Sequence, residues 1–190
     1  MFGRIFITRQ GYDPALGKHV KDPYLGANPS IGACRPDVRR QVPIGGQVFL
    51  ISGKIPQRPQ FVMGGLEVAE KVPMREAYDR FPEQRLHLRP DGQKGGNIIM
   101  DSSGRQHDLD DHRNFANRID NYVVGCKPIS LVTEQEITLG RQETLDALRA
   151  ILRSNGNTPH AIVGHYGKTL DEQQASALRA WLESIKKRAA

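Results

Sequence analysis

The sequence predicts an α+β fold: a small, bent, mostly antiparallel β-barrel with short flanking helices and a two-helix C-terminal extension. Three observations lead to this prediction. Short runs rich in β-branched and aromatic residues recur up to residue 132, a Gly-Gly pair interrupts the longest run, and strong helical periodicity begins only at residue 133. We therefore expect a β-rich domain at 1–132 and a helical extension at 133–190 that packs on or beside it.

The predicted strands are apolar runs bounded by glycine, proline or polar turns. The first covers 4–9, and the second covers 47–52. The third and longest covers 60–72, and its Gly64-Gly65 pair indicates a bulge of the kind that bends a strand around a barrel corner. Shorter strands are expected at 97–100, 121–125 and 129–132.

Helices are predicted at 74–81 and twice after residue 133. Pro82 ends the first of them. Thr133 and Glu136 have the spacing of a capping box, which predicts a helix from there to Gly156.

A second capping box, Thr169 with Glu172, predicts the last helix. Leu178, Trp181 and Ile185 lie on one face of it. That face either packs on the β-rich domain or docks a partner protein or a second copy of the chain, so a homodimer is one arrangement that the sequence allows.

Basic residues are concentrated at the N-terminal end. The first sixty residues hold nine Lys or Arg against three acidic residues, and this excess equals the net charge of +6 of all 190 residues. A local excess favours an anionic partner such as nucleic acid or a nucleotide phosphate. A solvated basic face is the alternative interpretation.

Cysteine use and hydropathy predict a soluble cytoplasmic protein without membrane contact. Cys34 and Cys126 form neither a disulfide framework nor a paired metal motif, and no run of eighteen apolar residues occurs. Cys34 is expected to be a packed residue rather than a nucleophile. No cofactor and no metal site can be assigned from the sequence.

The segment 34–40 is the first candidate site. It lies in a long stretch, 11–43, without useful periodicity, and loops of this length inside a domain are usually functional or mobile. Guanidinium groups bind phosphate well, so Arg35, Arg39 and Arg40 are predicted to hold phosphate. Alternatively, one arginine pairs with the neighbouring Asp37 or caps a strand end, and the others are solvated.

Three further residues are predicted to contact a nucleobase. Tyr12, on the same long loop, has a ring that could stack on a base. Asn97 or Asn114 could read the edge of that base with its amide.

Histidines and carboxylates between 107 and 112 form a second candidate site. His107 or His112 could act as a general base, with a neighbouring aspartate such as Asp111 orienting it or holding a divalent metal. The spacing matches neither a zinc pair on a helix nor a calcium loop. The competing interpretation is structural, with Asp110 or Asp111 capping a helix and His112 on its surface.

Taken together, these segments resemble the second of the nucleotide modification associated domain families. The residues that carry the resemblance are 11–14, 32–40, 45–53, 65–72, 96–99 and 121–125. It covers 1–132, and the strand after the Gly45-Gly46 pair departs from the family pattern at Gln47. The resemblance implies a bacterial or phage protein linked to DNA base hypermodification.

A second resemblance concerns the fold alone. A small bent β unit with a basic loop and helices beside it is similar to the PUA-like superfamily, whose ASCH, EVE and YTH members read modified bases in a cleft. Both resemblances favour a protein that binds a modified base, its nucleotide or nucleic acid. The alternatives are an enzyme of base or nucleotide modification that uses His107 or His112, and an interaction module that uses the C-terminal helices.

Overall fold

The computed structural model describes residues 2–190 and has one main sheet with the strand order β2-β7-β4-β3-β1-β8. Its neighbouring strands are antiparallel except for the parallel pair β1 and β3. Two short strands form a separate hairpin. The strands are β1 Gly3–Ile7, β2 Ser30–Ile31, β3 Gln47–Ile51, β4 Val62–Val72, β5 His87–Leu88, β6 Lys94–Gly95, β7 Tyr122–Ser130 and β8 Lys168–Leu170.

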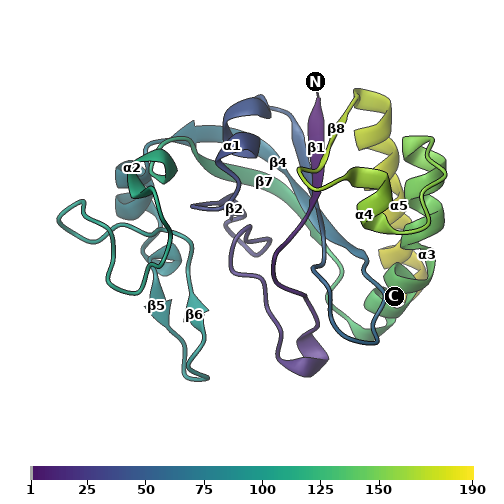
Figure 1. The fold of residues 1–190 in the computed structure, drawn as a ribbon, viewed down its shortest axis with the longest axis horizontal. Coiled ribbons are helices and arrows are strands. Elements are labelled where there is room, and N and C mark those ends of the chain that lie inside the picture. The colour runs from purple at the N-terminus through teal and green to yellow at the C-terminus, as the bar shows by residue number, and fades with distance from the viewer. Residues whose placement is uncertain (1) are drawn as a thin grey trace.

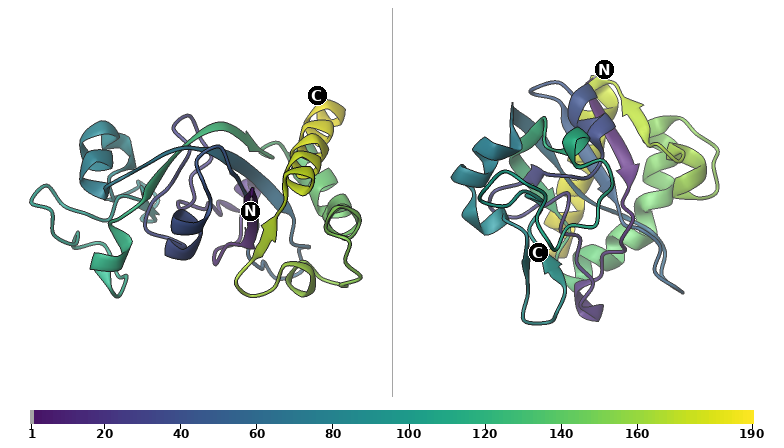
Figure 2. Two further views of the ribbon diagram at one scale, coloured as in Figure 1. Left: turned by 90° about the horizontal axis from the view of Figure 1, so that it is seen from above. Right: turned by 60° about the vertical axis from the view of Figure 1, so that its left-hand side comes forward.

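The main sheet is open, so the predicted barrel is not confirmed. β2 and β8 are its two edges, and no pairing joins them within the described residues 2–190. The broader prediction of an α+β fold with a mostly antiparallel sheet is confirmed. Seen from above, the long strands β4 and β7 form an arch that connects the two ends of the molecule (Figure 2).

The predicted irregularity at the Gly64-Gly65 pair is confirmed. The register of β4 shifts on both sides of this pair, against β3 and against β7. Gly64 has a φ of 151°, and a Cβ there would collide with the carbonyl oxygen of Ile129. A Cβ on Gly65 would lie 2.6 Å from the carbonyl oxygen of Val48. Glycine therefore allows the close backbone approach that bends the sheet.

The helices gather at the two ends of the sheet. α3, α4 and α5 stand together beside β1 and β8, whereas α2 and the β5–β6 hairpin lie at the opposite end (Figure 1). Short α1 lies between them. The helices are α1 Pro36–Gln41, α2 Met74–Arg80, α3 Glu134–Leu152, α4 Pro159–Val163 and α5 Glu172–Ala189, with 3-10 turns η1 Pro14–Leu16, η2 Pro82–Gln84 and η3 Phe115–Arg118.

The first predicted capping box is confirmed and the second is wrong. Thr133 caps α3, and the Glu136 side chain accepts from the Thr133 backbone N–H. The box of α5 is Asp171 with Gln174, because Thr169 belongs to β8, which pairs with β1. Three residues of edge strand were too few to be distinguished from a helix start in the sequence.

The apolar face of α5 lies inside the molecule. Leu178 and Ile185 are fully buried, and Trp181 is half-buried against the same core cluster as the sheet residues Ile5 and Phe49. The helical segment thus packs on the β-rich part. Leu178 and Ile185 therefore do not form an exposed apolar stripe on which a partner could dock.

A second, smaller core lies at the α2 end of the sheet. Met74 and Ala77 of α2 pack with Tyr122 of β7 and with Ile98 of the segment that was predicted as the strand 97–100. That segment is buried but makes only isolated bridges. None of the helices in residues 2–190 has the length and apolar character needed to cross a membrane.

Candidate nucleotide-binding surface

The arginine segment folds as a short helix, not as the loop expected from the sequence. Arg35 stands at the N-cap with a φ of 51°, and Pro36 follows at the first helical position, where its missing N–H costs no hydrogen bond. Asp37 lies in the first turn, where the helix dipole favours a carboxylate. As a result, the three arginine side chains lie in three different environments.

Arg39 points into the protein interior. Only 1% of it is exposed, and its guanidinium donates to the carbonyl oxygens of Cys34 (3.3 Å), Arg118 (3.1 Å) and Asp120. Burial lowers the pKa of Arg39, and the nearby Asp22 carboxylate opposes this by favouring the charged form. The prediction that Arg39 holds phosphate is therefore wrong, since Arg39 fastens α1 to the segment before β7.

Arg35 is partly exposed and held in place on three sides. Its Nε and Nη2 donate to the two carboxylate oxygens of Asp37 at 2.9 and 2.6 Å. Its guanidinium lies 4.5 Å from the ring centroid of Phe6, and Nη2 also donates to the carbonyl oxygen of Tyr166. The sequence alternative in which one arginine pairs with Asp37 is thus correct for Arg35.

Arg4 of β1 joins this group through the same partners, Tyr166 and Asp37. Its Nη2 donates to the Tyr166 carbonyl oxygen at 3.0 Å and lies 3.9 Å from the Asp37 carboxylate. Burial alone would raise the pKa of Asp37, but the hydrogen bond and charge of Arg35, together with Arg4, lower it. Two guanidinium groups therefore share one carboxylate, and positive charge remains in excess.

Two exposed side chains complete the group. Arg40 is solvent-exposed and lies three residues after Asp37, on the same side of α1. Tyr166 is 73% exposed, and the His165 ring contacts it edge-on with 4.8 Å between centroids. We call Arg4, Arg35, Arg40, His165 and Tyr166 the arginine–tyrosine surface.

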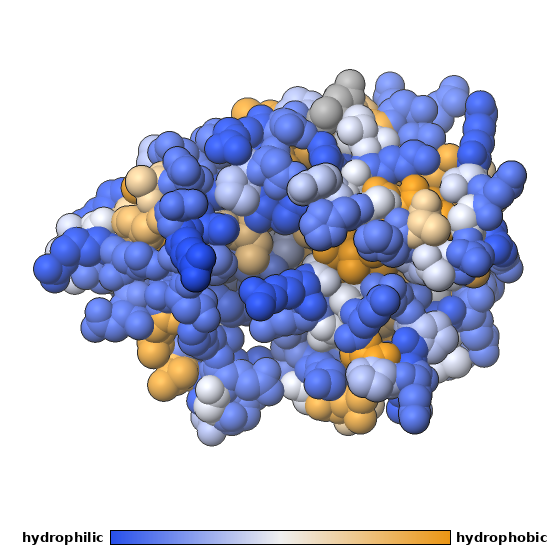
Figure 3. All heavy atoms as spheres, in the orientation of Figure 1, coloured by the Kyte–Doolittle hydropathy of each residue, from blue (hydrophilic) through white to orange (hydrophobic). Residues whose placement is uncertain are grey.

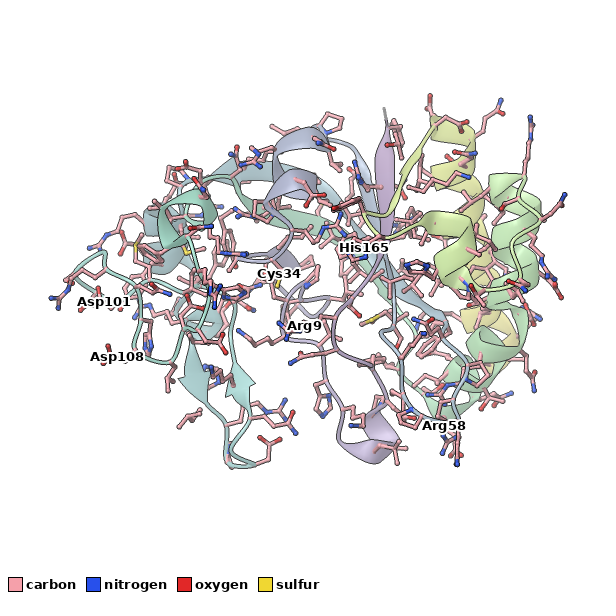
Figure 4. The ribbon with its side chains drawn as sticks, in the orientation of Figure 1. Arg9, Cys34, Arg58, Asp101, Asp108 and His165 are labelled. Atoms are coloured by element: carbon pink, nitrogen blue, oxygen red, sulfur yellow. The ribbon has the colours of Figure 1, made fainter. Side chains whose placement is uncertain are left out.

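The arginine–tyrosine surface belongs to a mostly hydrophilic face of the molecule (Figure 3). In the same view, the label of His165 lies near the middle of the molecule, whereas Asp101 and Asp108 lie at its left edge (Figure 4). Sequence reasoning missed His165 and Tyr166 because they lie far from α1 in the chain. The only local signal was a pair of aromatic residues between two glycines, which is typical of an exposed turn.

Tyr12 does not join the arginines. Its ring packs against Phe61, with 6.3 Å between centroids, and its backbone N–H donates to the Ser52 hydroxyl. Burial, followed by the charges of Glu136 and Asp13, raises the pKa of Tyr12. The predicted stacking residue is thus half-buried against Phe61.

Asn97 is completely buried and its amide is occupied. Its Nδ2 donates to the Ser30 hydroxyl at 2.9 Å, and its Oδ1 accepts from the Tyr122 hydroxyl at 2.9 Å. A direct contact between Asn97 and a base is therefore wrong. Asn114 is exposed, with a φ of 59° at the start of η3, and remains available for contacts.

The histidine segment contains an ordered Asp–His pair. His112 Nδ1 lies 2.6 Å from Asp110 Oδ1, and the other Asp110 oxygen accepts from Gln106 Nε2 at 2.8 Å. The Asp110 side chain is only 1% exposed, whereas Asp111 is exposed and lies 3.4 Å from Lys94 Nζ. The aspartate that contacts His112 is thus Asp110, whereas Asp111 pairs with Lys94.

His107 has a different role. Its Nδ1 accepts the backbone N–H of Leu109 at 3.1 Å, which supports the turn before Asp110. One oxygen or nitrogen atom from each of Asp110, Asp111 and His112 lies within 4.8 Å of the others, so this trio could hold a divalent cation. The neighbouring Lys94 ammonium and the Asp110–His112 hydrogen bond compete with such a cation.

Asp22 organises the loop beneath α1, and nothing in the sequence indicated it. Its two carboxylate oxygens accept the backbone N–H groups of Gly32 (2.8 Å) and Cys34 (2.6 Å). Burial, reinforced by the Asp22 charge, raises the pKa of the Cys34 thiol far above its ordinary value. Cys34 is thus a packed, protonated residue, as predicted.

Comparison with known proteins adds no relative. No family model, no curated protein and no solved structure matches this chain.

Proposed function

We propose that this protein binds nucleic acid or a nucleotide in a DNA base-modification context, using the arginine–tyrosine surface. One observation carries the proposal: Tyr166, whose side chain is exposed, lies next to the arginines, because both Arg4 and Arg35 donate to its backbone carbonyl oxygen. Positive charge next to an exposed aromatic ring is the combination that single-stranded nucleic acids require. The location of the basic excess in the first sixty residues supports the same partner.

Phosphate would bind to Arg40 and Arg35. Arg40 is exposed and needs no rearrangement. Arg35 already presents its guanidinium fork to the Asp37 carboxylate, which has the same bidentate geometry as a phosphate. A phosphate that replaces Asp37 leaves that carboxylate beside Arg4, 3.9 Å away, so its charge stays compensated.

The base would stack on Tyr166, not on Tyr12 as the sequence suggested. Tyr12 is packed against Phe61, whereas Tyr166 is free on one side and supported by the His165 ring on another. Stacking of a base on an aromatic side chain contributes about 1–3 kcal/mol and tolerates any base sequence. Asn114 is the remaining predicted residue that could contact a base edge.

The test is binding of single-stranded DNA, double-stranded DNA, RNA and free nucleotides, each with and without modified bases. We expect Tyr166→Ala to weaken single-strand binding about 5- to 150-fold, which corresponds to the loss of one stacked base. Tyr166→Phe keeps the ring and should bind like the wild type. If both variants bind like the wild type, Tyr166 is not the stacking residue.

Membership of the second nucleotide modification associated domain family also stays a proposal. It rests on the glycine, arginine and proline pattern of 32–40. This segment forms a loop and a helix, and hydrogen bonds of the Asp22 and Arg39 side chains hold it in place. A preference of the purified protein for one modified base over its unmodified form would support it. Equal binding to both forms would contradict a role as a reader of modification.

The Asp110–His112 pair favours a second candidate function, an enzyme of base or nucleotide modification. A buried carboxylate that fixes one imidazole nitrogen leaves the other free to act as a general base. Incubation of the protein with DNA and nucleotides, analysed by mass spectrometry, would detect a product. Asp110→Asn should then lower kcat, and the exposed Asp108→Asn serves as its matched control.

A further inference from the structure

Asp37 occupies the two hydrogen-bond donors with which Arg35 would hold a phosphate. Its Oδ1 accepts from Arg35 Nε at 2.9 Å, and its Oδ2 accepts from Arg35 Nη2 at 2.6 Å. A phosphate uses the same fork of a guanidinium group. Within residues 2–190, Asp37 is the only acidic residue that forms an ion pair with Arg35 or Arg4. The chain thus carries its own competitor for phosphate at this position.

The Asp37 carboxylate is charged and accessible from solvent. Burial would raise its pKa, but the hydrogen bond and charge of Arg35, followed by the Val38 backbone N–H and the charge of Arg4, lower it. The side chain of Asp37 is 34% exposed. An anion from solution can therefore reach this ion pair while α1 stays folded.

Arg4 offers a displaced Asp37 carboxylate a second partner. Arg4 Nη2 lies 3.9 Å from Asp37 Oδ2, the same oxygen that Arg35 Nη2 holds. Arg4 Nη1 donates to Gln41 and Nη2 to the Tyr166 carbonyl oxygen, but its buried Nε has no hydrogen-bond partner within residues 2–190. Arg4 therefore has an unused donor and a charge that Asp37 compensates only from a distance. A short movement of one carboxylate exchanges its two guanidinium partners.

We propose that Asp37 autoinhibits the phosphate contact: it holds Arg35 in the free protein and moves to Arg4 when phosphate binds. This inference rests on the proposed function of the arginine–tyrosine surface. The apparent affinity of a ligand is reduced by the fraction of molecules in which Arg35 is free. Because Asp37 lies two residues from Arg35, it competes at a high effective concentration. Weak anions therefore occupy Arg35 little, whereas a strand that also contacts Arg40 and Tyr166 displaces Asp37.

Replacement of the carboxylate by an amide tests the autoinhibition. Asp37→Asn keeps the shape of the side chain but removes its charge, so Arg35 becomes free for phosphate. Binding of a fluorescently labelled single-stranded oligonucleotide should become about tenfold tighter, as expected when Arg35 is free in about a tenth of wild-type molecules. Asp146→Asn removes an 83% exposed carboxylate on α3 and is the control, which should change the affinity less than about twofold.

A double-variant cycle separates this competition from a general charge effect. In an Arg35→Gln background Asp37 has no guanidinium fork to occupy, so adding Asp37→Asn should change the affinity less than about twofold. An equal gain in both backgrounds would show that Asp37 acts only as a nearby negative charge and would overturn the proposal.

The remaining outcomes distinguish the autoinhibition from the proposed function itself. Oligonucleotide binding by the wild type that is unchanged or weakened in Asp37→Asn, with the fold checked by circular dichroism, overturns the autoinhibition alone. If neither the wild type nor Asp37→Asn binds the oligonucleotide, the proposed function fails and the autoinhibition fails with it. Asp37→Ser takes the place of Asp37→Asn if that variant does not fold.

Discussion

Arg39→Ala tests the role of the one arginine in 34–40 that is buried. The substitution removes a guanidinium group that donates to three backbone carbonyl oxygens. It leaves those carbonyls without these donors, on the loop before α1 and on the segment before β7. We expect a large loss of folding stability and no direct effect on ligand binding.

The magnitude follows from the contacts. Each hydrogen bond from a charged donor contributes about 1.5–3 kcal/mol, and three of them would sum to about 4.5–9 kcal/mol. Burial of the guanidinium itself costs several kcal/mol, which offsets part of this gain. The expected net loss in the free energy of unfolding is therefore about 3–5 kcal/mol, a large fraction of the roughly 5–15 kcal/mol of a typical domain.

Urea unfolding followed by far-ultraviolet circular dichroism measures this loss. With a slope of about 2 kcal/mol per molar urea, the midpoint should fall by about 2 M. Arg40→Ala, which removes the adjacent but exposed arginine, is the matched control and should change the free energy of unfolding by less than about 0.5 kcal/mol. A loss below about 1 kcal/mol for Arg39→Ala, with an unchanged slope, would refute the reasoning.

Three further predictions concern stability. Gly64→Ala should destabilise the fold by about 3 kcal/mol in urea unfolding, because its φ is positive and its Cβ would meet the Ile129 carbonyl; a loss under about 1 kcal/mol would contradict this. Tyr122→Phe should cost about 1–2 kcal/mol in thermal unfolding, since it leaves Asn97 Oδ1 buried without its donor, and an unchanged midpoint would oppose that view. Burial raises the pKa of the Cys34 thiol, so the folded protein keeps the thiol proton at a pH where the unfolded chain, with a pKa of about 8.5, loses it. The free energy of unfolding should therefore fall as the pH rises from about 7 to 9.5, and it should fall less in Cys34→Ala.

Local patterns predicted the regular elements well. The strands 4–9, 47–52 and 60–72 correspond to β1, β3 and β4, and the capping box at Thr133 starts α3. These elements carry their signal within a few consecutive residues, as alternation, periodicity or a cap.

Elements that depend on distant partners were not predictable in this way. β8 is three residues long and exists because it pairs with β1, more than 160 residues earlier in the chain. The two edge strands leave the sheet open, a property of the strand order that no single segment encodes. The sequence does not predict α1, because six residues give too little helical periodicity.

The candidate site was predicted by residue type but not by arrangement. Arg35, Arg39 and Arg40 were chosen together, yet only the tertiary contacts decide that Arg39 is buried while Arg40 is exposed. Tyr166 reaches the site through carbonyl contacts with residues of β1 and α1. Contacts between residues so far apart in the chain cannot be predicted from the local sequence.

The most direct test of the central proposal is the salt dependence of binding to a fluorescently labelled single-stranded oligonucleotide. The variant pair is Arg35→Ala/Arg40→Ala, and the control Lys54→Ala/Lys187→Ala removes two exposed charges elsewhere. If both arginines contact phosphate, the slope of log K against log salt should become shallower by about 1.4 in the first variant and stay unchanged in the control. No binding by the wild type, or an equal slope in all three proteins, would contradict the proposed phosphate contacts.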